Sequence, residues 1–279
     1  MTRPRAELDQ EALAMFARKG KEGGPHVPQA GQANAVKVRR VLQLTSDLTR
    51  RPLEKLRILD LGCGEGMYAI EAALHGARVV AIDARTERMR DGAACAARHG
   101  LTGIRFEQAD VRSVTMASHG PFDVVWALGI LYHLDVPEVL TVLASIRGLC
   151  RSLLVVDTLI APKAALAVSH RDRVWEGDRV REHGDDDPPS LRRSRVLKSI
   201  DNTFSFRFTR ASLVRAVEDA GFSSVLECHV PVEPGKAEDR ITLAALPGER
   251  VSVATYPWVN ALSEAEIEQK LTTFKSEAE

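Results

Sequence analysis

A glycine-rich stretch near the start of the chain has the composition of a nucleotide-binding turn. Residues 59–66 read L-D-L-G-C-G-E-G and lie between a short apolar run and a helical pattern. Glycines at such a turn let the backbone bend tightly and approach a ligand closely. Dinucleotide-binding proteins place G-x-G-x-x-G here, but Gly66 comes two residues after Gly64, and Met67 occupies the dinucleotide position. The spacing therefore favours a ligand without a pyrophosphate.

Two aspartates follow the next two apolar runs. Asp83 comes directly after residues 78–82, about 20 residues beyond the first glycine, Gly62. A carboxylate at the end of the second strand can accept hydrogen bonds from both hydroxyls of a ribose. Asp110 follows the third run, residues 104–107.

These segments resemble, in order, the motifs of class I S-adenosylmethionine-dependent methyltransferases, and the resemblance covers residues 56–158. In that family the position of Asp110 contacts the adenine amino group, and the end of the fourth strand, here Phe122–Ala127, lies beneath the methionine part of the cofactor. The resemblance implies S-adenosylmethionine as the methyl donor. It implies these cofactor-binding residues: Asp60, Gly62, Cys63, Gly64, Gly66, Asp83, Ala84, Asp110, Val111, Ala127 and Leu128.

Three further side chains in the matched region are not expected to bind the adenosine part of the cofactor. Asp60 either hydrogen-bonds the nearby backbone or reaches the amino group of the cofactor, and both roles stay open. Cys63 is expected to be a small buried side chain, because methyl transfer from a sulfonium needs no thiol nucleophile. Asp123 is expected to be structural, at the start of a strand.

Tyr132 and His133 are the candidate catalytic residues. They follow the fourth strand, at the carboxyl edge where α/β sheets bind ligands. A general base assists methyl transfer when the acceptor is a hydroxyl or a carbon acid, which is the role proposed for His133. Tyr132 can bond to or stack on the acceptor. The alternative for His133 is that it only caps or packs at the start of a helix.

Short apolar runs that alternate with helical patterns must position these residues. Such alternation predicts βαβ units and a parallel sheet. We expect an α/β, Rossmann-like fold with a seven-stranded, mostly parallel sheet sandwiched by helices, an N-terminal helical extension and an insertion after strand 5. The expected parts are an N-terminal extension (1–50), a cofactor-binding core (51–159), an insertion or lid over the acceptor site (160–202), the C-terminal part of the core (203–249) and a tail helix (250–279).

The expected insertion is long and charged, as functional insertions often are. Trp175 either closes over the acceptor or anchors a local core. The acidic run 185–187 is interpreted as a solvated loop, so no metal site is predicted. The basic cluster Arg192, Arg193, Arg195 and Lys198 is interpreted as a solvated face.

Composition narrows the classes of partner. Lys plus Arg equals Asp plus Glu, at 38 each, so the formal net charge is zero and a nucleic-acid partner is disfavoured. No apolar run is long enough to span a bilayer, and the N-terminus lacks the apolar core of a signal peptide, so a cytoplasmic location is expected.

In the tail, Ser263 and Glu266 form a capping-box pattern, and Leu262 can pack on Ile267. The N-terminal and tail helices are the candidate surfaces for homo-oligomerisation.

The favoured function is an enzyme that methylates a small-molecule acceptor of the secondary-metabolite type. A tRNA wobble-uridine-modifying alkyl transferase is an alternative, because residues 129–134 and 199–202 faintly resemble that group. A non-catalytic cofactor-binding module is another, which the intact glycine turn and acidic positions disfavour. A dinucleotide-dependent reductase is opposed by the glycine spacing.

Overall fold

The computed structural model of this chain describes residues 27–229, 239–249 and 263–277. The chain divides into two compact units, Met1–Gly248 and Glu249–Glu279. Residues 1–26 of the expected N-terminal extension lie outside the described residues.

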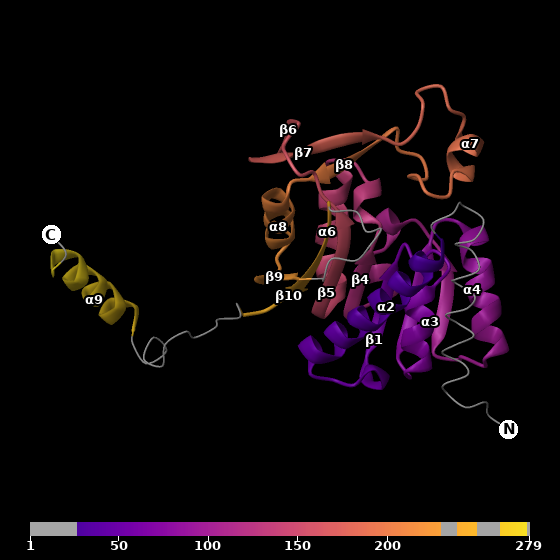
Figure 1. Cartoon of the computed structure of the whole chain (residues 1–279), viewed down its shortest axis with the longest axis horizontal. Helices are drawn as coiled ribbons and strands as arrows, with labels where there is room; N and C mark the ends of the chain where they lie inside the picture. Colours follow the sequence, from indigo (N-terminus) through magenta and orange to yellow (C-terminus); the bar gives the residue numbers. More distant parts are fainter. Residues whose placement is uncertain (1–26, 230–238, 250–262, 278–279) are drawn as a thin grey trace. The chain divides into compact units, whose positions relative to one another are not determined.

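The first unit is built on a seven-stranded sheet with the strand order β3-β2-β1-β4-β5-β10-β9 (Figure 1). Neighbouring strands from β3 to β5 pair in parallel, whereas β10 is antiparallel to both β5 and β9. This confirms the predicted fold class. The strands are β1 (Arg57–Leu61), β2 (Arg78–Asp83), β3 (Ile104–Gln108), β4 (Phe122–Leu128), β5 (Cys150–Leu159), β9 (Ser224–Cys228) and β10 (Arg240–Leu246).

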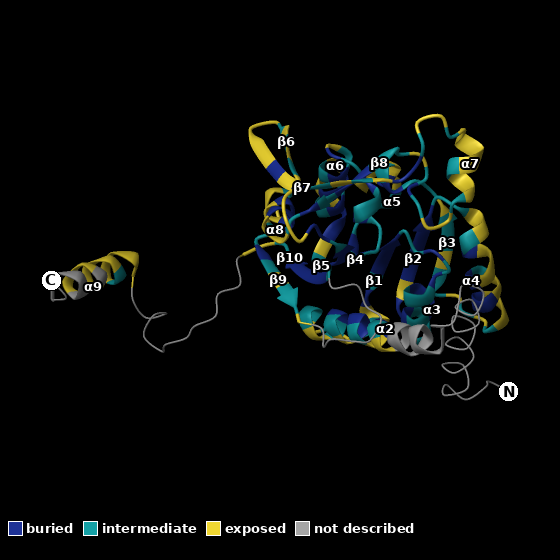
Figure 2. Ribbon diagram, turned by 45° about the horizontal axis from the view of Figure 1, so that its top comes forward, coloured by how far each residue is buried: buried dark blue, intermediate teal, exposed yellow. Residues whose placement is uncertain are grey.

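Helices cover both faces of this sheet, so its strands are largely buried (Figure 2). In β1 the face alternates with each residue: Ile58 packs in one apolar cluster and Leu59 in the other. The Ile58 cluster includes residues of α2 and α3, and the Leu59 cluster includes residues of α6 and α8. The longer helices are α2 (Val27–Thr49), α3 (Met67–Leu74), α4 (Thr86–Arg98), α6 (Glu138–Leu149) and α8 (Arg210–Asp219).

Short helical turns carry the chain between several of these elements. Thr209 caps α8 by accepting a hydrogen bond from the backbone of Ser212, as its sequence position predicts. Asp123 accepts the backbone N–H of Arg57 at 2.8 Å and a hydrogen bond from Arg51 at 2.7 Å, which fits its expected structural place. The short elements are η2 (Leu53–Lys55), η3 (Val111–Ser113), α5 (Met116–His119), η4 (Leu131–His133) and α7 (Pro189–Ser194).

The segment expected to be an insertion contains a second, three-stranded antiparallel sheet. Its strands are β6 (Leu166–His170), β7 (Arg173–Arg181) and β8 (Phe204–Phe208). The third of these strands lies in the part of the sequence assigned to the C-terminal core. Trp175 is buried in this region and meets the ring of Phe208 edge-on, with ring centroids 6.0 Å apart. Trp175 is therefore an anchor of the local core.

The second unit holds one described helix, α9 (Glu264–Glu277). Its expected capping box is present: the backbone N–H of Ser263 donates to Glu266 Oε2 at 2.7 Å, and that of Glu266 donates to Ser263 Oγ at 3.4 Å. Leu262, the expected packing partner of Ile267, lies outside the described residues. None of the helices in the described segments combines the length and apolar character of a membrane span.

Candidate functional site

A cavity of about 530 Å³ opens at the carboxyl ends of β1, β2 and β4. On one side its wall is formed by the turns that follow β1, β2 and β3. On the other side it is formed by η4, by the end of β7 and by residues 196–201, with Arg207 and Arg240 contributed by β8 and β10. The cavity therefore joins the predicted cofactor region to the predicted acceptor region.

The glycine turn takes the left-handed backbone conformation at all three glycines. The φ angles of Gly62, Gly64 and Gly66 are 69°, 56° and 77°. Gly62 and Gly64 line the cavity, but Gly66 does not. A Cβ on Gly66 would lie 2.5 Å from the ring of Phe106, so this glycine lets the turn pack on β3.

A further glycine, in α4, fixes the position of the same turn. A Cβ on Gly92 would lie 2.0 Å from the backbone oxygen of Glu65, a distance far inside van der Waals contact. Helix α4 therefore supports the glycine turn from behind, backbone against backbone. Sequence reasoning missed Gly92, although a lone glycine inside a strong helical pattern is a known sign of close packing.

The other predicted cofactor residues mostly lie on the cavity wall. The exception is Ala127, which is fully buried in the sheet and lines no part of the cavity. The predicted residues on the wall are Asp60, Gly62, Cys63, Gly64, Asp83, Ala84, Asp110, Val111 and Leu128. Cys63 is half-buried, and burial is the main cause that raises the pKa of its thiol, so the thiolate form is disfavoured.

Asp60 is a buried carboxyl group with an unused oxygen at the floor of the cavity. Its side chain is 1% exposed, and within the described part of the chain nothing hydrogen-bonds Oδ2. Burial, together with the negative charge of Asp83, raises the pKa of Asp60 to about 7. A rise of this size corresponds to a penalty of roughly 4 kcal/mol on the charged form.

Asp83 ties the end of β2 to the glycine turn. Its Oδ2 accepts the backbone N–H of Gly64 at 3.0 Å, and its Oδ1 accepts that of Arg85 at 2.9 Å. An ionised carboxylate has about four acceptor positions, so both oxygens can still accept further hydrogen bonds from a ligand.

Asp110 caps the turn η3 and is paired with Arg112. Hydrogen bonds and charge from Arg112 outweigh the effect of burial and lower the pKa of Asp110. Arg112 also contacts Glu138 at 3.1 Å and Asp201 at 2.7 Å. One guanidinium thus connects the predicted adenine position to Glu138 on α6 and to Asp201, which lies far along the chain.

The two candidate catalytic residues lie side by side on η4 and both line the cavity. The ring centroids of Tyr132 and His133 are 4.3 Å apart. His133 Nδ1 lies 3.2 Å from Oε1 of Glu182, the residue directly after β7, and no described residue hydrogen-bonds His133 Nε2. Arg240 lies over the ring of Tyr132, 5.7 Å from its centroid, and is paired with buried Asp157.

Residues 183–203, which we call the covering loop, lie against the core through contacts with arginines. The side chain of Arg85 donates to the backbone oxygens of Lys198 and Ser199 at 3.0 and 3.1 Å, and also to those of Arg193 and Arg195. Arg88, on α4, donates to Val196 at 3.3 Å. The core thus attaches the covering loop next to the cavity.

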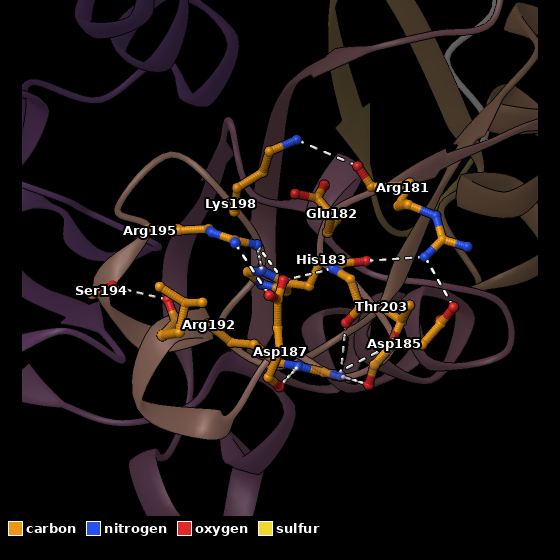
Figure 3. Close-up of polar contacts among 12 residues, drawn as sticks. Arg181, Glu182, His183, Asp185, Asp187, Arg192, Ser194, Arg195, Lys198 and Thr203 are labelled. Atoms are coloured by element: carbon orange, nitrogen blue, oxygen red, sulfur yellow. Dashed lines mark hydrogen bonds and ion pairs between the residues drawn. The ribbon is translucent and has the colours of Figure 1, made fainter.

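Other arginines hold the covering loop together from within (Figure 3). Arg192 donates to the backbone oxygens of Gly184, Asp185 and Asp201, and Arg195 pairs with Asp187. Two members of the basic cluster expected to be a solvated face are therefore internal cross-links of the loop. Asp187 is likewise an ion-pair partner rather than a solvated residue. The described residues contain no group of three or more potential metal-binding side chains.

Glu182, Arg85 and Arg240 are the residues of this site that sequence reasoning missed. Glu182 directly follows β7 and Arg240 begins β10, both far along the chain from the segments they meet, and Arg85 follows β2 without any distinctive motif. Only the paired strands and the covering loop bring them to the cavity.

A family profile described as a methyltransferase domain matches residues 58–152. A ubiquinone biosynthesis O-methyltransferase of Caulobacter sp. (strain K31) is 35% identical over 121 residues, which are 43% of this chain and 47% of that protein. The corresponding enzyme of Methylocella silvestris is 33% identical over 147 residues, 47% of this chain and 56% of that protein. The chain thus spans about half the length of the curated relatives it matches.

Solved structures share the fold. The N-terminal domain of EvdMO1, in the presence of SAH and D-fucose, gives a TM-score of 0.60 at 20% identity, covering 76% of this chain and 83% of that one. The Burkholderia thailandensis 1,6-didemethyltoxoflavin-N1-methyltransferase with bound S-adenosylhomocysteine gives 0.56 at 18% identity, covering 88% and 92%.

The contact between Gly92 and Glu65 generates a testable prediction. Gly92→Ala must displace the glycine turn, because the new Cβ cannot occupy a point 2.0 Å from a backbone oxygen. We expect binding of S-adenosylhomocysteine, measured by calorimetry, to weaken by at least about 10-fold, or ~1.4 kcal/mol. Gly148→Ala on α6 is the control, because no atom lies within 4 Å of its Cβ position. Equal affinities in both variants would contradict the account.

Proposed function

We propose that this chain methylates a hydroxyl group of a small molecule. The premise of this proposal is that residues 58–152 belong to the class I S-adenosylmethionine-dependent methyltransferase family. The observation that carries the proposal is that Asp60 and His133 line the same cavity. One end of the cavity suits the methyl donor. At the other end, His133 is a base next to the proposed acceptor site.

The donor end has the groups that S-adenosylmethionine requires. Asp60 has a buried oxygen without a partner, which suits the ammonium group of the methionine part. Asp83 retains acceptor positions for the ribose hydroxyls, and Asp110 with Val111 lies where the adenine is expected. Gly62 and Gly64 leave room for close approach of the ligand to the backbone.

The acceptor end has an apolar wall and one base. When bound, the cofactor supplies an electrophilic methyl group on a sulfonium. His133 takes the proton of the acceptor hydroxyl at Nε2, and the carboxylate of Glu182 stabilises the positive charge on the ring. Tyr132 contacts the acceptor beside the base. Apolar side chains that exclude water from this end are Ile130, Leu134, Leu159 and Val180.

The charges around the cavity favour a small molecule over a tRNA. Arg112 is engaged by three carboxylates, and Arg85 is engaged by backbone oxygens. Arg195 is paired with Asp187. Guanidinium groups that are bound within the protein cannot neutralise phosphates without breaking these contacts, and a nucleic-acid partner depends on such neutralisation. The relatives named as O-methyltransferases agree with a hydroxyl acceptor.

Removal of the base tests the acceptor half of this proposal. His133→Ala is expected to lower kcat by roughly 10²–10⁴-fold, the usual contribution of a general base. Binding of S-adenosylhomocysteine should not change, because Asp60 and the glycine turn remain. Transfer of an isotope-labelled methyl group to a panel of small hydroxyl acceptors gives the rate, with His170→Ala on β6 as the control. Unchanged turnover at saturating acceptor would remove His133 from the mechanism.

The pH dependence of cofactor binding tests the donor half. Asp60 has a pKa of about 7 in the ligand-free protein, so below that pH its carboxyl is neutral. A cationic ligand favours the ionised form, so binding displaces a proton and the affinity should rise as the pH increases through about 7. Calorimetry with S-adenosylmethionine at several pH values measures this. Asp60→Asn should bind more weakly and lose that rise; an equally steep rise in both proteins would contradict the assigned contact.

A further inference from the structure

Glu182 joins η4 of the core to the covering loop and to strand β8. Its Oε1 faces His133 Nδ1 at 3.2 Å and accepts the hydroxyl of Ser205, on β8, at 2.8 Å. Its Oε2 accepts the backbone N–H of Ser199, in the covering loop, at 3.1 Å. The residue is only 6% exposed, so each of these contacts is made away from bulk water.

The carboxylate of Glu182 is ionised throughout the ordinary pH range. Burial acts to raise its pKa, but the hydrogen bonds from His133, Ser205 and Ser199 outweigh burial and lower the pKa to about 2. An ionised carboxylate can only accept hydrogen bonds. A neutral His133 facing it must therefore carry its proton on Nδ1, which leaves Nε2 without one.

The covering loop controls the orientation of this carboxylate. Ser199 is 4% exposed, and both of its backbone groups are held: its N–H donates to Glu182, and its oxygen accepts from His183 Nε2 at 2.8 Å. Arg85 of the core also donates to that oxygen, at 3.1 Å. Ser199 is thus held by Glu182 and His183 (Figure 3) and by Arg85 of the core.

We infer that Glu182 is a positioning residue that keeps His133 in the tautomer with an unprotonated Nε2, and that Ser199 of the covering loop fixes the orientation of Glu182. With Glu182 held in this orientation, the lone pair at Nε2 is available to take a proton. This inference rests on the proposed function for its consequence, because a base is needed only if a proton leaves the acceptor.

Glu182→Gln tests the inference because the surrounding donors dictate how the new amide must lie. The backbone N–H of Ser199 can only donate, so the amide oxygen takes the Oε2 position and the amide nitrogen takes the position facing His133. The hydroxyl of Ser205, which donates to Oε1 in the unmodified protein, can rotate to accept from that nitrogen. The amide then donates to Nδ1, and the neutral ring must move its proton to Nε2. The variant thus keeps the shape of the site but reverses the tautomer of the base.

The primary readout is nitrogen NMR of the ¹⁵N-histidine-labelled full chain at a pH where the ring is neutral, with the signal of His133 assigned by its loss in His133→Ala. We expect the Nδ1–H tautomer in the unmodified protein and in Glu182→Asp, and the Nε2–H tautomer in Glu182→Gln. Glu176→Gln, at an exposed position on the preceding strand β7, is the matched control and should retain Nδ1–H. The Nε2–H tautomer in the unmodified protein would overturn the inference without any variant, as would an unchanged tautomer in folded Glu182→Gln.

Kinetics separate positioning from a merely structural role. Glu182→Gln should lower kcat by roughly 10²–10⁴-fold while KM changes little, because the site keeps its shape and the base is in the wrong tautomer. Glu182→Asp should restore most of kcat. A rise in KM with unchanged kcat would contradict a positioning role. Calorimetry with S-adenosylhomocysteine is independent of these readouts: absence of binding with a reversed tautomer would reject the proposed function and leave the positioning by Glu182 intact.

Discussion

The reversal of strand order between β1 and β4 decides where the rest of the site can lie. Strand β1 pairs with β2 on one side and with β4 on the other, so the connections that leave these strands travel in opposite directions. In open α/β sheets this arrangement leaves a crevice beyond the carboxyl ends of the strands. The glycine turn, Asp83 and η4 all follow directly from strands that end at this crevice. Their proximity is a consequence of topology before any side chain is considered.

The second half of the cavity depends on contacts between the core and the covering loop. Arg85 and Arg88 bind backbone oxygens of that loop, and Arg112 binds Asp201. These arginines come from the turns and the helix that also form the cofactor region. These contacts therefore join the donor region to the acceptor region. The partner of His133, Glu182, is the residue that directly precedes the same loop.

The residues of the donor half of the site can be predicted from sequence patterns, because they are close in sequence to the strands that position them. Gly62, Asp83 and Asp110 each follow an apolar run, and a periodic pattern locates such runs. The acceptor half differs, since Glu182 lies 49 positions from His133, and no local pattern can pair them. The sequence analysis missed strand β7 because this strand is rich in charged residues. It pairs with β6 and β8 in a small sheet that has many exposed positions, so it lacks the apolar run of a buried strand. Gly66 and Ala127 resemble the family positions but are packing residues of the turn and the sheet.

The central claim is that the cavity at this crevice binds S-adenosylmethionine rather than a nicotinamide dinucleotide. Titration calorimetry of the full chain with S-adenosylhomocysteine and, separately, with NADH tests it most directly, because both ligands contain the adenosine that this fold accommodates. We predict that S-adenosylhomocysteine binds at one site per chain and that NADH neither binds nor displaces it. Binding of NADH, or no heat from S-adenosylhomocysteine in the folded protein, would contradict the account.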